Sequence, residues 1–181
     1  MLEWIEHGVQ FDLTSPIPPF FHTQISHEQV ALDYWRQTLK PHYLQSGAIR
    51  QIPAPPPDNR HISKCFFVSK SSGGWRLVID LRFINEHFEP ALKIKFENLS
   101  LLKFANKDLE WGAKMDLSDA YHHLCLHPSL RPYFQFSVAG EFFEVIAVPF
   151  GWNLAPYVFT KFTRPVLTAL RYPEVTRQAG Y

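Results

Sequence analysis

Two pairs of β-forming segments, each joined by a short turn that contains glycine, constrain the fold of this chain most. Residues 65–70 and 75–80 are rich in aromatic and β-branched side chains, and two serines and two glycines separate them. Residues 134–138 and 142–148 flank Gly140 in the same way. Glycine readily adopts the positive φ that tight hairpin turns require, so both pairs predict antiparallel hairpins.

Helical spacing of apolar side chains predicts two helices. Residues 27–39 follow an S-x-x-Q capping pattern that begins at Ser26, and we expect this helix to end before Pro41. A second helix is expected from residue 156 to about 171, with Pro165 as an interior break. Helices interleaved with antiparallel hairpins favour an α+β fold over a doubly wound parallel sheet.

The remaining segments predict irregular structure or short strands. Residues 1–25 contain an extended stretch punctuated by prolines, and we expect an irregular arm there. Residues 41–59 carry five prolines, so we expect a stiff connector without strand pairing. A short strand over residues 112–115 is expected to lead into Asp116.

Composition excludes several classes of protein. The 181 residues are 46% hydrophobic and 15% aromatic, which is enough for a packed core and excludes wholesale disorder. The formal net charge of +1 excludes a polycation that coats nucleic acid. The chain has two cysteines without a C-x-x-C pair, an N-terminus unlike a leader peptide, and no apolar run of about 18 residues. These features predict an intracellular protein of the cytoplasm or the nucleus.

Charge is nevertheless unevenly distributed along the chain. Residues 1–33 hold five acidic and no basic side chains, whereas residues 34–82 hold eight Lys or Arg against two Asp. A basic segment of this kind suits a polyanionic partner, because Lys and Arg replace the counterions of phosphates. Charge alone is equally consistent with a solvated basic surface.

Two acidic side chains, Asp116 and Asp119, are the candidates for chemistry. A carboxylate at the end of a strand can hold a hard cation, and oxygen ligands suit Mg²⁺. Taken alone, the D-x-x-D spacing more often marks an Asp that caps a turn or a helix. Tyr121 and the later segments 149–152 and 155–156 accompany the pair and favour the metal interpretation.

Several segments together resemble the reverse transcriptases of retroelements. Residues 44–85 resemble the fingers of these polymerases, including G-G-W-R at 73–76 and D-L-R-F-I-N at 80–85. Residues 116–121 resemble the palm motif that carries the first catalytic aspartate, and residues 148–156 resemble the next motif. The stretches D-A-Y-H-H and F-T-K-F are most similar to DIRS-like and gypsy-like retrotransposons.

The resemblance implies a right-hand polymerase fold with fingers and an incomplete, ferredoxin-like palm sheet. It divides the chain into an N-terminal arm and helix (1–43), fingers (44–90) and part of the palm (91–181). The implied partners are an RNA or DNA template with its primer, dNTPs and other regions of the element polyprotein, with no membrane. The implied activity is RNA-directed DNA polymerisation, in which two Mg²⁺ ions, or Mn²⁺ in their place, support nucleotidyl transfer to a primer 3′-hydroxyl.

The resemblance also assigns roles to individual residues. Asp116 and the backbone carbonyl of Leu117 would ligate the metal ions, with Asp116 as the catalytic carboxylate. Arg76, assisted by Lys70, would contact the triphosphate from the first hairpin, because a guanidinium fork suits phosphate oxygens.

Further nucleotide contacts are implied in the palm. The backbone N–H groups of Asp119 and Ala120 would cradle the β- and γ-phosphates. Tyr121 would reject a ribose 2′-hydroxyl by steric clash. The floor of the site would be formed on the nucleotide side by Phe150 and Gly151 and on the template side by Trp152 and Pro156.

Simpler structural roles remain open for several side chains. Trp75 and Trp152 are expected to pack in the core more often than to stack on bases. Arg82 should pair with a carboxylate. His123 and His127 have i, i+4 spacing, but the lack of clustered Cys or acidic partners disfavours a metal site there. Both cysteines are expected to be buried thiols.

The chain departs from the family at its catalytic carboxylates. The family needs a later Tyr-x-Asp-Asp hairpin, whereas Asp119 is the last Asp among these residues. We therefore expect residues 1–181 alone to lack polymerase activity and to leave a sheet edge exposed. A non-catalytic nucleic-acid-binding or decaying remnant of such an element is the alternative. An unrelated Mg²⁺ phosphotransferase that uses Asp116 and Asp119 would leave the fingers-like residues unexplained.

Overall fold

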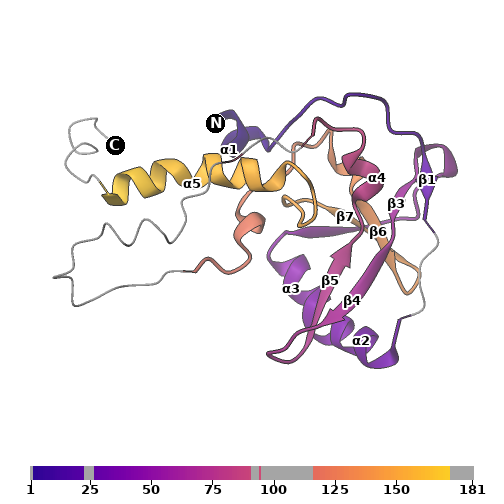
Figure 1. Cartoon of the computed structure of the whole chain (residues 1–181). Coiled ribbons are helices and arrows are strands. Elements are labelled where there is room, and N and C mark those ends of the chain that lie inside the picture. The colour runs from indigo at the N-terminus through magenta and orange to yellow at the C-terminus, as the bar shows by residue number, and fades with distance from the viewer. Residues whose placement is uncertain (1, 23–26, 91–93, 95–115, 172–181) are drawn as a thin grey trace.

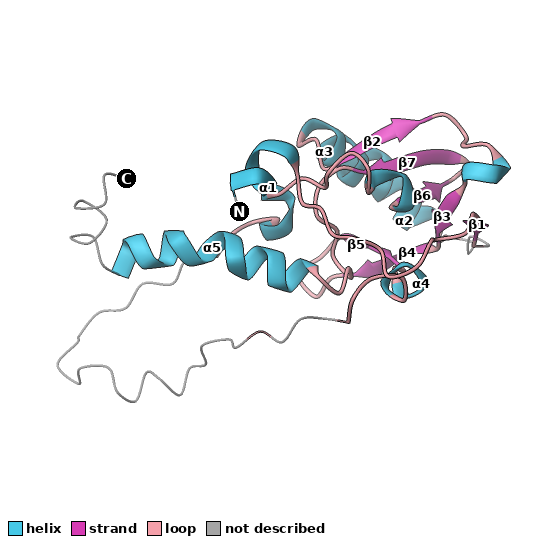
Figure 2. Ribbon diagram, turned by 90° about the horizontal axis from the view of Figure 1, so that it is seen from above, coloured by secondary structure: helices cyan, strands magenta, loops and turns pink. Residues whose placement is uncertain are grey.

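Two β-sheets with helices packed around them make up the described part of the chain (Figures 1 and 2). The computed structural model describes residues 2–22, 27–90, 94 and 116–171. The α-helices are α1 (Leu2–His7), α2 (Gln29–Tyr34), α3 (Lys40–Gln45), α4 (Arg82–Asn85) and α5 (Ala155–Arg171). The strands are β1 (Phe20–Phe21), β2 (Ile49–Ile52), β3 (His61–Ser63), β4 (Cys65–Ser69), β5 (Trp75–Ile79), β6 (Gln135–Val138) and β7 (Glu141–Val145). The α+β class predicted from the sequence is confirmed, whereas the expected strand at 112–115 lies outside the described residues.

The larger sheet has the strand order β1-β3-β6-β7-β2. Strand β3 runs parallel to both β1 and β6, and β7 runs antiparallel to both β6 and β2. The prediction that residues 41–59 form a connector without strand pairing is therefore wrong for β2, which pairs with β7 from Ile49↔Val145 to Ile52↔Phe142. The prolines of this segment resume only at residue 53, so β2 keeps all of its backbone N–H groups for pairing.

The N-terminal arm is also more regular than predicted. Residues 2–7 form α1, and β1 pairs in parallel with β3, with Phe20 opposite His61 and Phe21 opposite Ile62. The arm thus adds an edge strand to the larger sheet. Sequence patterns could not show this, because a strand of two residues carries no periodicity.

The first predicted helix is longer than expected. Helix α2, the π-helical turn η1 (Trp35–Leu39) and α3 follow one another without a break, so the prediction that the helix ends before Pro41 is wrong. Pro41 is the second residue of α3 and directly follows the π-helical turn η1, inside this continuous helical segment. The N-cap is Glu28, which makes no side-chain cap hydrogen bond, and Ser26 lies outside the described residues.

Both predicted hairpins are confirmed. Strands β4 and β5 pair from Cys65↔Ile79 to Ser69↔Trp75 and form a separate two-stranded sheet. Strands β6 and β7 are joined by a tight turn at Ala139 and Gly140, both with positive φ (50° and 81°). Two positive φ angles characterise the two-residue turn whose twist suits a β-hairpin.

Helix α5 continues through Pro165, so the predicted interior break is wrong. Pro165 is exposed, and water can therefore satisfy the carbonyl that loses its helical partner. The helix extends away from the two sheets (Figure 1). Within the residues that the structure describes, we find no helix that is both long and apolar enough to cross a bilayer.

Trp35 joins the helices, the hairpin and the larger sheet in one core. Its fully buried ring lies 5.4 Å from the ring of Phe143 in β7, 6.2 Å from Phe136 in β6 and 6.0 Å from Phe67 in β4 (centroid distances). Helices α2 and α3 accordingly lie beside both sheets (Figures 1 and 2). This packing fixes where the hairpin stands relative to the rest of the protein.

Candidate nucleotide site

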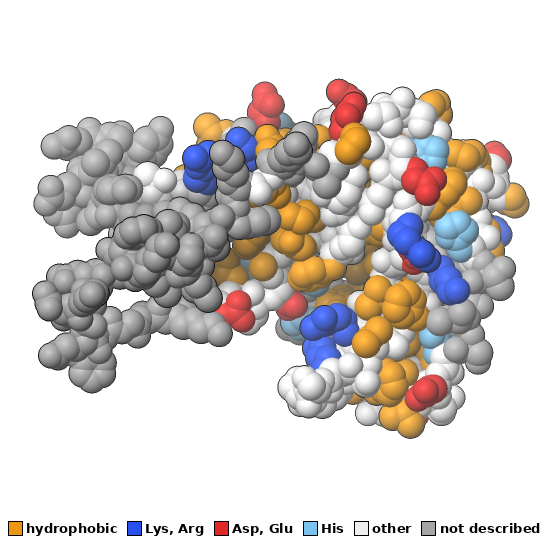
Figure 3. Space-filling model, viewed as in Figure 1, with side chains coloured by type: hydrophobic (Ala, Val, Ile, Leu, Met, Phe, Trp, Pro, Cys, Tyr) orange, Lys and Arg blue, Asp and Glu red, His pale blue; other side chains and the backbone are white. Residues whose placement is uncertain are grey.

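A cavity of about 560 Å³ lies between the β4–β5 hairpin and the loop of residues 117–122. Lys70 and Arg76 line it from the hairpin side, and Asp119 and Ala120 line it from the loop side. Figure 3 shows Lys and Arg side chains beside a hollow at the turn end of this hairpin. Further lining residues are Tyr43, Ala48, Ile49, Leu77, Val78, Ile79, Leu117, His122, Val145, Pro149, Phe150 and Gly151. The cavity therefore brings together most of the side chains that the sequence assigned to a nucleotide.

The turn of the hairpin sets the position of its two cations. The N–H of Lys70 donates to the carbonyl of Gly74 at 2.9 Å, and the N–H of Gly73 donates back to the carbonyl of Lys70 at 3.0 Å. Gly74 has a φ of +80°, and a Cβ there would lie 2.5 Å from the hydroxyl of Tyr34 in α2. The turn thus packs against α2, and only glycine fits this contact without strain.

The loop opposite the hairpin has an unusual backbone. Asp119 adopts the left-handed conformation (φ 49°, ψ 43°) and directly precedes the 3-10 turn η4 (Ala120–His123). Its carbonyl accepts a hydrogen bond from the N–H of His122 at 2.7 Å. Few residues other than glycine, among them Asp and Asn, adopt this conformation at moderate cost.

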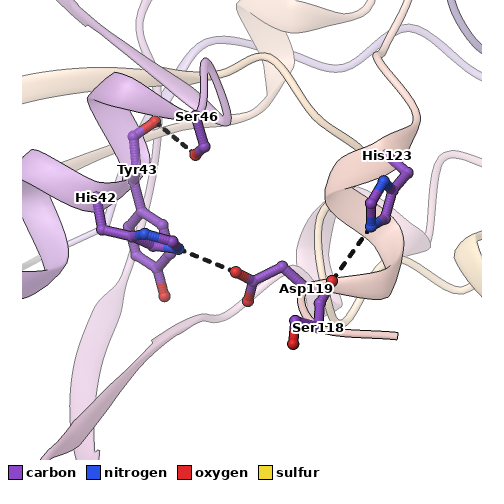
Figure 4. Close-up of polar contacts among 6 residues, drawn as sticks. All are labelled: His42, Tyr43, Ser46, Ser118, Asp119 and His123. Carbon is purple, nitrogen blue, oxygen red and sulfur yellow. Dashed lines mark hydrogen bonds and ion pairs between the residues drawn. The ribbon is translucent and has the colours of Figure 1, made fainter. Parts of the chain in front are cut away.

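Helix α3 contacts this loop through two neighbouring residues that the sequence analysis did not single out. His42 Nε2 lies 2.9 Å from Asp119 Oδ2, and Figure 4 shows the two side chains pointing toward each other. The rings of Tyr43 and His122 meet edge to face, with centroids 5.6 Å apart. No local pattern could have revealed these pairs, because 77 residues separate His42 from Asp119.

The electrostatics of the cavity reflect both burial and charge. Burial raises the pKa of Tyr43, and the Asp119 carboxylate raises it further, whereas Arg76 lowers it. Burial lowers the pKa of His122, against the opposing effect of Asp119. Both neutral rings therefore line a cavity whose charged groups, among the described residues, are Lys70, Arg76 and Asp119.

Tyr121 packs beside the cavity rather than lining it. Its ring lies 4.6 Å from the ring of Phe150 and 5.4 Å from that of Phe159 in α5. Burial raises the pKa of its phenol. Phe150 does line the cavity and is 56% exposed, so its ring is the member of this aromatic pair that is accessible from the cavity.

The floor residues divide into two groups. Gly151 lines the cavity with a φ of +92°, a conformation that favours glycine. Trp152 is only 1% exposed and packs against Phe11, Phe88 and Phe134, so its predicted contact with a template is wrong. A ring buried in the core cannot stack on a base, and the simpler expectation of core packing is confirmed. Pro156 is half-buried in the first turn of α5.

The expected metal ligands are present but are few among the described residues. Asp116 is exposed, and Leu117, whose carbonyl would be the second ligand, is 55% exposed and lines the cavity. In the part of the chain that the structure describes, no three His, Cys, Asp or Glu side chains gather into a metal site. One carboxylate and one carbonyl fit Mg²⁺ in their chemistry and fall short of its six-ligand shell in number.

The simpler roles hold for most of the other side chains. Arg82 pairs with Asp80 at 2.6 Å, as expected. His123 Nε2 donates to the carbonyl of Ser118 at 3.2 Å. Cys65 is buried, whereas Cys125 is exposed, so the expectation of two buried thiols is wrong for Cys125. Burial raises the pKa of the Cys65 thiol to about 12.

Comparison with known proteins identifies the class. The reverse transcriptase (RNA-dependent DNA polymerase) family matches residues 68–176, which is more than half of the chain. This chain therefore belongs to the reverse transcriptase family.

Among individual relatives, similarity is found to viral polyproteins. The Pol polyprotein of Equine infectious anemia virus (strain Wyoming) is 30% identical over an alignment of 131 residues, and the match covers 65% of this chain and 11% of that protein. The genome polyprotein of Petunia vein clearing virus (isolate Shepherd) is 32% identical over an alignment of 111 residues, and the match covers 59% of this chain and 5% of that protein. The chain thus spans only a small part of these relatives.

Solved structures show the same fold. A Prototype Foamy Virus protease–reverse transcriptase (the CSH mutant) matches with a TM-score of 0.69 and 19% identity, over 86% of this chain and 20% of that chain. The foamy viral protease–reverse transcriptase in complex with dsDNA matches with a TM-score of 0.65 and 19% identity, over 86% of this chain and 31% of that chain. The mixed α+β fold described above matches the fingers and palm of these enzymes.

Proposed function

We propose that this chain forms the fingers and part of the palm of a retroelement polymerase that extends a primer with dNTPs on an RNA or DNA template. One observation carries the proposal. A single cavity is lined by two cations of the β4–β5 hairpin, Lys70 and Arg76, and by the left-handed turn at Asp119 and Ala120. A triphosphate suits positive side chains and backbone N–H groups. This cavity is lined by both cations and by the turn of Asp119 and Ala120, whose N–H groups would cradle the phosphates.

The roles of the other residues follow from their places around this cavity. Asp116 and the Leu117 carbonyl would hold Mg²⁺, or Mn²⁺ in its place. When bound, such ions neutralise phosphate charge and lower the pKa of the attacking hydroxyl. Tyr121, held against Phe150 at 4.6 Å, is the residue that would exclude a ribose 2′-hydroxyl.

The wider assignments are supported by sequence resemblance alone. They include a DIRS-like or gypsy-like element, the other polyprotein regions as partners, and domain boundaries at residues 43 and 90. An intracellular location is instead supported by the low cysteine content. The larger sheet takes strands from both sides of residue 90, so fingers and palm share one hydrogen-bonded unit. The relatives reported above are polyproteins, of which this chain spans a small part. The polymerase activity is therefore proposed for a longer protein that also carries the Tyr-x-Asp-Asp carboxylates.

Triphosphate binding tests the proposal directly. We would titrate the chain with dTTP and Mg²⁺ in a calorimeter and compare Arg76→Ala with the matched control Arg36→Ala. Arg36 is exposed, pairs only with Asp33 among the described contacts and does not line the cavity. We expect Arg76→Ala to weaken binding about tenfold or more, since a charged hydrogen bond contributes about 1.5–3 kcal/mol, and Arg36→Ala to change it little.

Two results would contradict the proposal. Absence of dTTP binding by the folded wild-type chain would remove the nucleotide site. Equal loss in the two variants would show that binding responds to net charge rather than to this cavity. In a longer protein that carries the Tyr-x-Asp-Asp carboxylates, Asp116→Asn should abolish primer extension, whereas a remnant would show only salt-sensitive binding of nucleic acid.

A further inference from the structure

The contact between His42 and Asp119 joins two walls of the site that are distant in sequence. His42 lies on α3, and Asp119 lies in the loop before η4. Their side chains are 53% and 46% exposed, and Nε2 and Oδ2 are 2.9 Å apart. A carboxylate can only accept, so the Nε2–H of His42 must be the donor. Figure 4 shows the Asp119 carboxylate directed toward α3.

The turn that His42 contacts has an unfavourable backbone conformation. A left-handed Asp is unfavourable relative to ordinary backbone conformations and persists where surrounding contacts hold it. Two such contacts come from adjacent residues of α3, namely the His42 hydrogen bond and the edge-to-face packing of Tyr43 on His122. Helix α3 therefore supports the turn from one side, while the carbonyl of Asp119 is held within the loop by the N–H of His122.

Charge gives this contact a second consequence. Asp119 is the acidic side chain among the residues that line the cavity, which also include the cations Lys70 and Arg76. An unrestrained carboxylate at this position would repel a triphosphate and compete with it for both cations. A donor on α3 keeps the carboxylate directed to the helix and leaves the cations available to the ligand.

We infer that His42 is a positioning residue for triphosphate binding, which acts by holding the Asp119 side chain and the turn that carries it. The inference rests on the proposed nucleotide site. It adds that a residue of α3, outside the hairpin and the loop, affects how tightly this site binds a triphosphate. The contribution comes from the hydrogen bond at Nε2. Glutamine places an amide N–H at a similar reach from the backbone and should replace it.

The experiment measures dissociation constants of the 181-residue chain for tripolyphosphate with Mg²⁺ by calorimetry. The variants are His42→Ala, His42→Gln, Asp119→Asn and the double variant His42→Ala/Asp119→Asn. The control is Arg36→Ala, which removes a half-exposed contact elsewhere on the protein, between side chains that are 50% and 49% exposed. Exposed pairs contribute at most about 1 kcal/mol, so His42→Ala should weaken binding about two- to fivefold and shift Tm by less than about 4 °C. His42→Gln should retain most of the affinity, and Arg36→Ala should match the wild type.

The double variant separates positioning from a general structural role. Once Asp119 is Asn and has lost its charge, removal of His42 should change the affinity by less than in the wild-type background. If wild-type chain binds tripolyphosphate and His42→Ala binds it equally well, the inference is wrong while the proposed site stands. Failure of His42→Gln to restore affinity, or an undiminished effect in the Asp119→Asn background, also overturns the inference. Absence of binding by the wild type overturns both the site and the inference.

Discussion

Replacement of Trp35 tests how the core positions the site. The side chain is fully buried, and its ring neighbours lie in the hairpin and the larger sheet. Truncation of a buried aromatic to alanine costs about 3–5 kcal/mol, from lost burial and from the cavity that remains. We expect Trp35→Ala to lose about this much of the free energy of unfolding. It should also weaken triphosphate binding, because the hairpin that carries Lys70 and Arg76 loses its support.

The matched replacement Trp35→Phe should behave differently. Among the described residues the buried indole Nε1–H of Trp35 has no hydrogen-bond partner. An unpaired buried donor costs about 1–3 kcal/mol, and phenylalanine removes this cost while it keeps an aromatic ring. The gain offsets the smaller ring, so we expect Trp35→Phe to stay within about 1.5 kcal/mol of the wild type. Urea unfolding followed by circular dichroism measures both variants, and a loss above about 3 kcal/mol for Trp35→Phe would refute this reasoning.

Three further predictions concern other buried groups. Burial lowers the pKa of His61, so the unfolded chain takes up a proton that the folded chain excludes; stability should hold above about pH 6.5 and fall below it. His61→Gln should flatten this dependence in urea titrations, and an unchanged profile would contradict the assignment. A maleimide should label exposed Cys125 rapidly and buried Cys65 only on unfolding. Rapid labelling of both cysteines in native buffer would show that Cys65 is not buried in the core. Arg50→Ala leaves the buried Glu144 carboxylate without its 2.6 Å partner and should lower the free energy of unfolding by about 1–3 kcal/mol. The double variant Arg50→Ala/Glu144→Gln should recover part of this loss, and an equal loss in the single and double variants would rule out coupling between the two side chains.

Local patterns predicted the elements that depend on local chemistry. The two hairpins follow from β-forming residues on either side of glycine turns, and Gly140 indeed has the positive φ that such a turn requires. The sequence could not show that β2 pairs with β7, since the partners Ile49 and Val145 are far apart along the chain. The sequence also could not show that the helix continues beyond Pro41, because this depends on the π-helical turn η1 that precedes α3.

The site shows the same division. Lys70, Arg76, Asp119 and Gly151 were identified from motifs, and the cavity brings them together. Trp152 lies in the same motif but faces the core, because a motif gives the identity of a residue and not the direction of its side chain. His42 was missed because its role depends on the approach of α3 to a loop 77 residues later.

The hydrogen-bonding pattern of the hairpin has a consequence for how ligand affinity is measured. Among the residues that the structure describes, strands β4 and β5 pair with each other alone, and a two-stranded ladder is marginally stable by itself. Its amide protons should therefore exchange with solvent sooner than those of β6 and β7, which lie inside the five-stranded sheet. The hairpin forms one wall of the cavity and packs on Trp35 through Phe67, so we expect the cavity to need the hairpin in this position. Any observed dissociation constant is thus the intrinsic one divided by the docked fraction, and a ligand that binds there should slow exchange in the hairpin first.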